Sequence, residues 1–145
     1  MSESEYVPSP TTWVRRQVEK IEATGDTRSV SVLSRPVVML TMRGAKTGAI
    51  RKVPLMRVEH EGVYAAVASQ GGAARHPKWY ANLRANPQIS LQDGTATWDA
   101  VAREITGAER DEWWERCVAA YPPYADYQTR TDRVIPVLLL EPVDG

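Results

Sequence analysis

The stretch VVMLTMRGAKTGAIRKVPLMRV, residues 37–58, decides how this chain folds. Its first six residues are almost all apolar and predict a strand. The glycine-rich segment Gly44–Gly48 predicts a turn, and residues 51–58 predict the returning strand of a hairpin. Pro54 has no amide hydrogen to give to a neighbouring strand. We therefore expect the returning strand to lie at a sheet edge or to be bulged at Pro54.

The segments beyond this hairpin also predict short strands joined by tight turns. Residues 63–69 predict a strand rich in alanine, against which either a flat ligand or a closely packed helix could lie. Residues 89–92 and 95–103 alternate in polarity around Asp93-Gly94, and residues 134–140 predict a last strand. About six strands, mostly linked by hairpins, predict an α+β fold in which a mostly antiparallel sheet closes into a barrel with flanking helices.

Three segments have helical periodicity. Apolar residues recur from Trp13 to Ala23 and stop before Gly25; a second helix follows Pro77, and a third runs over residues 106–120 behind a capping box formed by Thr106 and Glu109. A turn with three tyrosines is expected after the third helix. The first helix should cover the core, although an arm that covers a pocket or touches a membrane is an alternative; its mixed charges weaken the membrane interpretation.

The composition is that of an ordinary globular domain. The 145 residues have 18 basic and 18 acidic side chains, which argues against a global field for nucleic acid or membranes. We expect one domain over residues 1–145, with residues 1–11 as a flexible arm. The polar N-terminus and the single cysteine favour a cytoplasmic protein, with membrane association through the first helix left open. Cys117 falls on an apolar helix face and is expected to be a core thiol.

Two glycine-rich turns are candidate binding sites. In the first, Lys46, Thr47, Gly48 and Arg51 could surround a phosphate; the alternative is a solvated hairpin with surface charges. The order of these residues is not that of a phosphate-binding P-loop, and no crossover helix follows.

The second turn, residues 69–72, leads into a helix on which Lys78, Trp79 and Asn82 share a face. An indole and a carboxamide placed in this way could flank a flat ring and bind its edge, or they could be a core tryptophan and a capping asparagine. The two histidines, His60 and His76, predict no metal site.

Three motifs carry a family resemblance. They are Gly44-x-Lys46-Thr47-Gly48-x-x-Arg51-x-x-Pro54-Leu55, then Ala68-Ser69-x-Gly71-Gly72 with Pro77-x-Trp79-Tyr80-x-Asn82-Leu83, and finally Tyr121-Pro122-x-Tyr124-x-x-Tyr127-x-x-x-Thr131-x-Arg133. In order and spacing the chain resembles the deazaflavin-dependent nitroreductase family of actinobacteria, the F420H2-dependent quinone and nitro reductases. The resemblance implies a split β-barrel, like that of FMN-binding proteins, that binds coenzyme F420, an 8-hydroxy-5-deazaflavin with a phospholactyl-oligoglutamate tail.

The resemblance also implies roles for individual residues. The tail's phosphate and carboxylates would be held by Lys46, Thr47, Gly48 and Arg51. The ring would be contacted by Pro54, Ala68, Ser69 and Gln70 and, from the helix, by Lys78, Trp79 and Asn82. The substrate pocket would be formed by Met56, Tyr121, Tyr124 and Tyr127. Ser69, Tyr124 and Tyr127 would be catalytic, hydrogen-bonding the acceptor oxygen and relaying a proton.

Three positions depart from the family pattern. Ala45 stands where arginine is common, which would remove one tail contact worth about 1–3 kcal/mol. Met56 replaces an aromatic residue at the pocket floor, and Gln70 replaces lysine or asparagine. These two changes bear on substrate preference more than on cofactor binding.

The implied activity is hydride transfer from reduced F420 to a quinone or a nitroaromatic compound. One alternative is an FMN-dependent oxidoreductase on a similar barrel, and another is a non-catalytic deazaflavin carrier. The spread of cationic side chains over Arg43, Lys46, Arg51 and Lys52 favours a long polyanionic tail over the single phosphate of FMN. The sequence leaves the oligomeric state and the physiological acceptor open.

Overall fold

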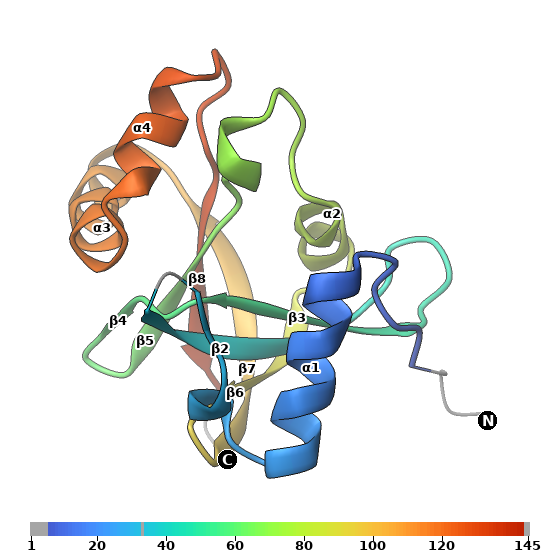
Figure 1. The fold of residues 1–145 in the computed structure, drawn as a ribbon. Coiled ribbons are helices and arrows are strands. Elements are labelled where there is room, and N and C mark those ends of the chain that lie inside the picture. Colours follow the sequence, from blue (N-terminus) through green and yellow to red (C-terminus); the bar gives the residue numbers. More distant parts are fainter. Residues whose placement is uncertain (1–5, 33, 144–145) are drawn as a thin grey trace.

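The computed structural model describes residues 6–32 and 34–143 and contains one curled antiparallel sheet with helices packed around it (Figure 1). The strands are β1 Ser31–Val32, β2 Arg35–Arg43, β3 Ile50–Met56, β4 Glu59–His60, β5 Val63–Val67, β6 Gln88–Asp93, β7 Ala96–Ile105 and β8 Val137–Pro142. The helices are α1 Thr12–Thr24, α2 Lys78–Ala85, α3 Gly107–Ala120 and α4 Pro123–Thr129, with short 3-10 helices η1 Thr27–Ser29 and η2 Gln70–Gly72.

The sheet has the order β1-β2-β6-β7-β8-β5-β4, and β3 also pairs with β2. The six strands expected from the sequence are all present, so the predicted antiparallel α+β architecture is confirmed. The two additional strands, β1 and β4, have two residues each, which is too short to show a periodic pattern.

The edge position expected for the strand containing Pro54 is confirmed. Along its whole length β3 pairs with β2, with Pro54 opposite Met39. On its other side, within the described residues, β3 makes an isolated bridge from Ile50 to Tyr6, and the Val7 amide donates to the Ile50 carbonyl at 2.8 Å. Tyr6 and Val7 of the expected N-terminal arm thus pair with the first residue of β3, while residues 1–5 lie outside the described residues.

Strand β8 is apolar at successive positions because both of its faces are covered. Leu138 and Leu140 belong to the cluster inside the curl of the sheet, whereas Val137 and Leu139 pack against α3 and α4. All four side chains are at most 3% exposed. A strand buried on both faces has no reason to alternate in polarity.

Helix α1 ends as the sequence predicts. Gly25 takes a left-handed conformation with φ of 70°, and its amide donates to the Ile21 carbonyl at 2.7 Å. Glycine suits this position because it has no Cβ to clash. The buried face of α1, Val18 and Ile21, packs on Met39 of β2. No helix among residues 6–32 and 34–143 is long and apolar enough to cross a membrane.

Two local predictions at the α3 region are wrong. Thr106 occupies the N-cap of α3 but its side chain accepts no capping hydrogen bond, and Glu109 pairs instead with Arg103 at 2.9 Å. The Glu109 carboxylate forms an ion pair with Arg103 of β7 in place of the capping hydrogen bond. In the segment expected to be a three-tyrosine turn, Tyr121 ends α3, whereas Tyr124 and Tyr127 lie on the helix α4, since Pro123 starts a helix as readily as it ends one.

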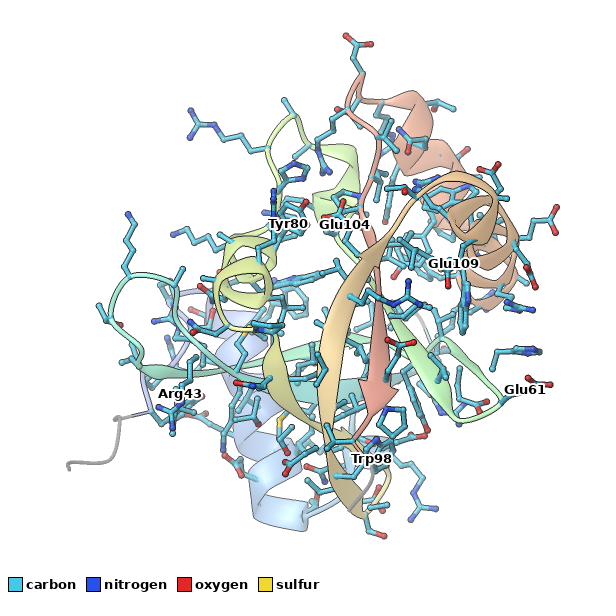
Figure 2. All side chains as sticks on the ribbon, turned by 180° about the vertical axis from the view of Figure 1, so that it is seen from behind. Arg43, Glu61, Tyr80, Trp98, Glu104 and Glu109 are labelled. Carbon is cyan, nitrogen blue, oxygen red and sulfur yellow. The ribbon has the colours of Figure 1, made fainter. Side chains whose placement is uncertain are left out.

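A polar bond on the concave side of the sheet connects α2 to β7. Figure 2 places Tyr80 of α2 beside Glu104 of β7, and the phenol donates to the carboxylate at 2.6 Å. This bond, together with the buried face of Tyr80 and Leu83, fixes α2 on the sheet.

Candidate functional site

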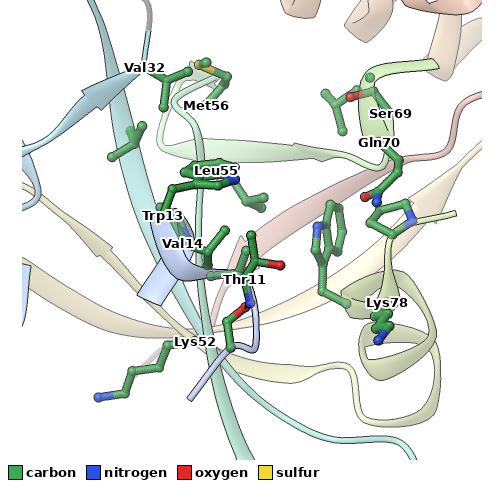
Figure 3. Close-up of a pocket in the computed structure, with 18 of the residues that line it drawn as sticks. Thr11, Trp13, Val14, Val32, Lys52, Leu55, Met56, Ser69, Gln70 and Lys78 are labelled. Carbon is green, nitrogen blue, oxygen red and sulfur yellow. The ribbon is translucent and has the colours of Figure 1, made fainter. Parts of the chain in front are cut away.

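A cavity of about 510 Å³ opens between β3, α1, η2, α2 and α4. In Figure 3, Trp13, Val32, Leu55 and Met56 lie on one side of it, and Ser69, Gln70 and Lys78 lie opposite. The cavity is lined by Ser9, Pro10, Thr11, Trp13, Val14, Val32, Val37, Met42, Arg51, Lys52, Val53, Pro54, Leu55, Met56, Val67, Ser69, Gln70, Gly71, Pro77, Lys78, Trp79, Asn82, Tyr121, Tyr124 and Tyr127.

Most of the residues expected to form a site converge on this cavity. They come from four separate elements and are Arg51, Pro54, Met56, Ser69, Gln70, Lys78, Trp79, Asn82, Tyr121, Tyr124 and Tyr127. Lys46, Thr47, Gly48 and Ala68 are not among the lining residues. Ala68 is fully buried in the core, so its small size serves close packing within the sheet.

The first turn is arranged around its own backbone. The Thr47 hydroxyl accepts from the Ala49 amide at 3.1 Å, and the Arg43 guanidinium donates to the Gly48 carbonyl at 3.3 Å. Arg51 is the member of the expected phosphate group that reaches the cavity. The cofactor tail could contact Lys46, Thr47 and Gly48 only if it extended beyond the cavity. Their role in binding the tail therefore stays a prediction.

Lys52 also lines the cavity, but its charge is already partnered. Its ammonium pairs with Glu22 of α1 and lies 5.0 Å from the centre of the Tyr6 ring. Within the described residues, Arg51 and Lys78 form no ion pair. These two cations are the ones free to bind an anionic ligand.

Asn82 connects α2 to the first turn. Its side-chain oxygen accepts from the Ala45 amide at 2.9 Å, and Asn86 one turn later donates to the Gly44 carbonyl at 3.4 Å. The carboxamide of Asn82 thus positions the hairpin beside the cavity. Its NH2 group contacts Met42 sulfur at 3.8 Å, a weak acceptor that leaves donor capacity toward a ligand.

The second turn has a left-handed backbone over three successive residues. The φ angles are 49° at Gln70, 64° at Gly71 and 82° at Gly72. A Cβ on Gly72 would stand 2.6 Å from the Tyr127 carbonyl oxygen and 3.1 Å from the Arg130 Cβ. Gly72 therefore allows η2 to pack directly on the backbone of α4. This contact couples the turn at residues 69–72, called here the Ser69 turn, to α4, called here the tyrosine helix because it carries Tyr124 and Tyr127.

The tyrosines form one wall with polar ends. The Tyr121 and Tyr127 hydroxyls are 3.1 Å apart, and all three rings lie within 4.9–6.2 Å of one another, centre to centre. Burial and the hydrogen bond to Tyr127 raise the pKa of Tyr121 to about 12, and burial raises the pKa of Tyr124 further. Tyr121 and Tyr124 are therefore neutral donors at any ordinary pH. In the described part of the chain, the Tyr124 hydroxyl has no protein partner.

Arg133 does not line the cavity but holds the turn that does, and the sequence alone assigned it no role. Its guanidinium donates to the carbonyls of Ala68, Ser69 and Ala73 at 3.0, 2.7 and 2.9 Å, and its Nη1 lies 3.1 Å from His76 Nδ1. Guanidinium has no acceptor, so His76 accepts through a neutral ring. Burial and the neighbouring cation lower the pKa of His76, which agrees with that state.

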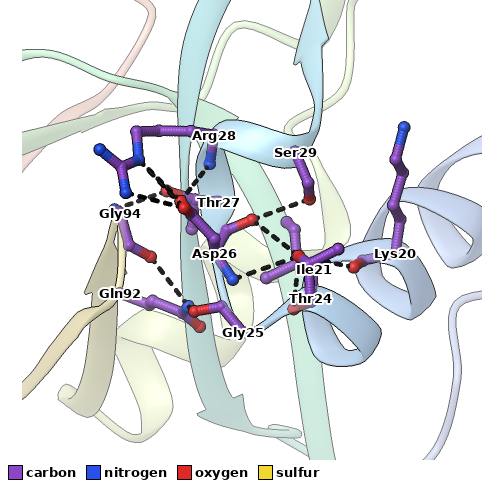
Figure 4. A network of polar contacts seen from close by, with 10 residues as sticks. All are labelled: Lys20, Ile21, Thr24, Gly25, Asp26, Thr27, Arg28, Ser29, Gln92 and Gly94. Atoms are coloured by element: carbon purple, nitrogen blue, oxygen red, sulfur yellow. Dashed lines mark hydrogen bonds and ion pairs between the residues drawn. The ribbon is translucent and has the colours of Figure 1, made fainter.

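The α1 wall of the cavity is fixed by contacts beyond its C-terminus (Figure 4). Thr27 is 1% exposed; its amide donates to the Gly94 carbonyl at 3.0 Å, and its hydroxyl accepts from the Gly94 amide at 2.6 Å. The Gln92 side chain donates to the Gly25 carbonyl at 3.1 Å. These bonds tie the end of α1 to the β6–β7 hairpin. At the other end of α1, Trp13 lines the cavity while remaining 57% exposed.

Other reactive groups lie apart from this site. Cys117 is fully buried, and burial raises its thiol pKa to about 12, so the expected core thiol is confirmed. His60 packs edge-on against Trp113 at 6.0 Å, away from the cavity lining. Among the residues that the structure describes, no cluster of His, Cys, Asp or Glu could hold a metal ion.

The cavity suits a flat ligand with an anionic extension. Trp79 and Pro54 offer apolar surface, Arg51 and Lys78 offer unpaired charge, and Ser69 is a buried polar residue whose hydroxyl faces no protein acceptor in the described chain. Residues 13–142 match the model of the F420H(2)-dependent quinone reductase family. The chain belongs to this family.

Individual relatives agree with the family match. An F420H(2)-dependent quinone reductase of Mycobacterium tuberculosis is 34% identical over 108 residues, which is 72% of either chain. The solved structure of an F420-H2 dependent reductase, FDR-A, is 57% identical with a TM-score of 0.71, covering 77% of this chain and 99% of that one. A structure described as a domain-swapped dimer is also 57% identical, with a TM-score of 0.73, covering 92% of this chain and all of the other.

More distant structures share the fold of this F420H(2)-dependent quinone reductase family member. The heme storage protein HutZ of Vibrio cholerae is 18% identical with a TM-score of 0.56, and covers 77% of this chain and 84% of its own. The expected split-barrel class is therefore confirmed by both the sheet order and its structural neighbours.

Proposed function

We propose that this protein is an F420H2-dependent reductase that transfers hydride from the reduced deazaflavin to a quinone. The observation that carries the proposal is a cavity in which cations, a tryptophan and three phenols meet, in a chain of the F420H(2)-dependent quinone reductase family. When bound, F420 supplies the hydride chemistry; the protein's own residues bind, orient and protonate.

The cavity residues divide by chemistry into two groups. Arg51 and Lys78 would attract the phosphate and carboxylates of the tail, with Lys52 available if it exchanges Glu22 for the ligand. Trp79 and Pro54 would contact the flat ring, as the resemblance implies. In this proposal the ring would lie near Ser69, and the tail would run toward β3 and the first turn.

The phenols and Ser69 would handle the acceptor. Hydride transfer leaves negative charge on a quinone oxygen, and a neutral hydroxyl can hydrogen-bond that oxygen and pass it a proton. Tyr124 is the strongest candidate because its hydroxyl is not used within the described chain, whereas Tyr121 and Tyr127 bond to each other. Aromatic walls suit flat acceptors, so a nitroaromatic compound is a second substrate class for the same cavity.

The direct test is hydride transfer to menadione under anaerobic conditions, followed by the return of oxidised F420 absorbance. We expect turnover by the wild type and a strong loss in Ser69→Ala, with Ser90→Ala on β6, outside this cavity, as the matched control. Cofactor binding with no turnover on any quinone or nitroaromatic compound would favour the carrier interpretation.

Association and location are further proposals. A relative with 57% identity is described as a domain-swapped dimer, which makes self-association worth measuring by light scattering. The cytoplasmic location and the peripheral membrane contact of α1 stay predictions. Trp13 is exposed, but it also lines the cavity, so covering the site explains its position without a membrane.

A further inference from the structure

The turn after β5 presents three consecutive backbone amides that have no protein acceptor in residues 6–32 and 34–143. Ser69 has right-handed angles, φ −78° and ψ −38°, and Gln70 and Gly71 have positive φ. A right-handed residue followed by a left-handed one turns successive N–H groups toward one side, forming a concave site for an anion. Within the described residues, the amides of Ser69, Gln70 and Gly71 donate to no protein group.

These three residues all line the cavity. The bonds that shape the turn use the neighbouring amides instead, since Gly72 donates to the Ser69 carbonyl at 2.9 Å and Ala73 donates to the Gln70 carbonyl at 3.1 Å. The fold therefore does not use the amides of Ser69, Gln70 and Gly71, and these residues line the cavity where a ligand would lie.

The Arg133 guanidinium stands behind the same peptide groups. Two of its hydrogen bonds go to the carbonyls of Ala68 and Ser69, and these carbonyls share their peptide units with the Ser69 and Gln70 amides. A cation bound to a carbonyl draws electron density from its peptide unit, which makes the attached N–H a stronger donor. Arg133 therefore acts on two of the three free amides.

The charge of Arg133 is not neutralised locally. Among the ion pairs of the described chain none includes Arg133, and its fourth partner, His76, is a neutral acceptor. Arg133 is half-buried, so solvent screens its charge only in part. Here one net positive charge is kept directly behind the turn, where it favours negative charge in the cavity.

We propose that the Ser69, Gln70 and Gly71 amides form an anion hole for a negatively charged oxygen of the cofactor ring or of the acceptor, and that Arg133 is the positioning residue that shapes and polarises it. The proposal rests on the proposed function only for the identity of the ligand. In hydride transfer to a quinone, the transferred hydrogen keeps both bonding electrons, one negative charge arrives on a quinone oxygen, and a proton then neutralises it. An anion hole stabilises that oxygen before the proton arrives.

The first experiment needs no variant. Backbone amide NMR spectra of the ¹⁵N-labelled wild type are recorded while oxidised F420 is added, and then while menadione is added to the complex. We expect large downfield proton shifts at Ser69, Gln70 and Gly71, and small ones at Ala73 and Ala74. Shifts with F420 alone assign the oxygen to the cofactor, and shifts only with menadione assign it to the acceptor. No downfield shift at the three amides in either step overturns the proposal.

The second experiment isolates the charge of Arg133. Arg133→Gln keeps some hydrogen-bonding capacity without charge, and Arg133→Lys keeps the charge. Arg75→Gln, in the loop between η2 and α2, removes an exposed charge near the turn and serves as a control. We expect Arg133→Gln to lose at least about tenfold in F420 affinity or in turnover relative to Arg75→Gln, the size of one charge interaction at partial burial. Arg133→Lys should recover most of that loss.

The outcomes separate an electrostatic role from a purely structural one. Equal losses in Arg133→Gln and Arg133→Lys, or no loss beyond that of Arg75→Gln, contradict the assignment. Thermal unfolding of every variant shows whether the fold is intact, and if Arg133→Gln does not fold, the NMR titration decides. Downfield shifts with F420 in a protein that reduces no acceptor would remove the proposed activity and leave the anion hole standing.

Discussion

Replacing Gly72 with alanine perturbs the contact between the Ser69 turn and the tyrosine helix. The added Cβ would lie 2.6 Å from the Tyr127 carbonyl oxygen and 3.1 Å from both Tyr127 Cα and Arg130 Cβ. Two of these three neighbours are backbone atoms, which cannot rotate away. The whole of η2 or α4 must therefore shift to accept the substitution.

Gly71 offers a matched control at the adjacent position. Its φ is 64°, so alanine there is strained in the same way, but its added Cβ would meet nothing within 4 Å. Alanine in a left-handed conformation costs about 1 kcal/mol, and forcing atoms into a packed contact costs about 1–3 kcal/mol more. We expect Gly71→Ala to lose about 1 kcal/mol and Gly72→Ala to lose about 3 kcal/mol.

Thermal unfolding measures this difference. For a chain of this size, 1 kcal/mol corresponds to roughly 3 °C in Tm, so Gly72→Ala should unfold about 6 °C below Gly71→Ala. Since Tyr127 moves with α4, Gly72→Ala should also weaken turnover of menadione, whereas Gly71→Ala should affect it less. Equal Tm values for the two variants would refute the inference that η2 packs on the α4 backbone through Gly72.

Three further predictions concern single side chains. Tyr124→Phe should lower turnover by about a hundredfold or more, the usual contribution of general acid catalysis, with little change in the F420 dissociation constant; unchanged turnover would remove that phenol from the mechanism. Asn82→Ala leaves the Ala45 amide without its acceptor and should cost about 1 kcal/mol in urea unfolding, with faster amide exchange at Ala45; slow exchange there would contradict it. His76 has a pKa below its ordinary 6.5, because burial and Arg133 favour the neutral ring, so the unfolded chain binds more protons and this stability is lost as pH falls through and below 6.5. Between pH 7.5 and 5.5, wild type and His60→Gln should lose more thermal stability than His76→Gln, and parallel losses in all three would contradict this.

Local signals in the sequence predicted most of the fold. Pro54 located an edge strand because a missing amide hydrogen excludes a position in the middle of a sheet, and Gly25 located the end of α1 because it fits a left-handed C-cap. Both signals act within a few residues. The strands β1 and β4 were not predicted because two residues are too few to show an alternation of polarity.

The mistakes arose where distant partners compete with local ones. Glu109 is well placed for a capping box, but Arg103 on β7 offers a stronger charge partner. Pro122-Pro123 follows the end of α3 as predicted, yet Pro123 also begins α4. Two successive prolines do not indicate whether a turn or a new helix follows them. Each outcome was decided by a contact that local pattern does not contain.

The candidate site was predicted in its members more than in its connections. The spacing of the motifs indicated Ser69, Trp79 and the three tyrosines as site residues, and these residues line one cavity. The pairing of Lys52 with Glu22 depends on how α1 crosses β3, 30 residues away. The contact of Arg133 with Ser69 spans 64 residues, and no local pattern could have revealed it.

The central claim is that this cavity holds a deazaflavin whose anionic tail binds the free cations. Titration of F420 and FMN against intrinsic fluorescence tests it most directly, because Trp13 and Trp79 both line the cavity. We predict that F420 binds at least about tenfold more tightly than FMN, and that Arg51→Met weakens F420 by about tenfold, the contribution of one charge-assisted contact. Tighter binding of FMN, or F420 affinity unchanged in Arg51→Met, would contradict the account.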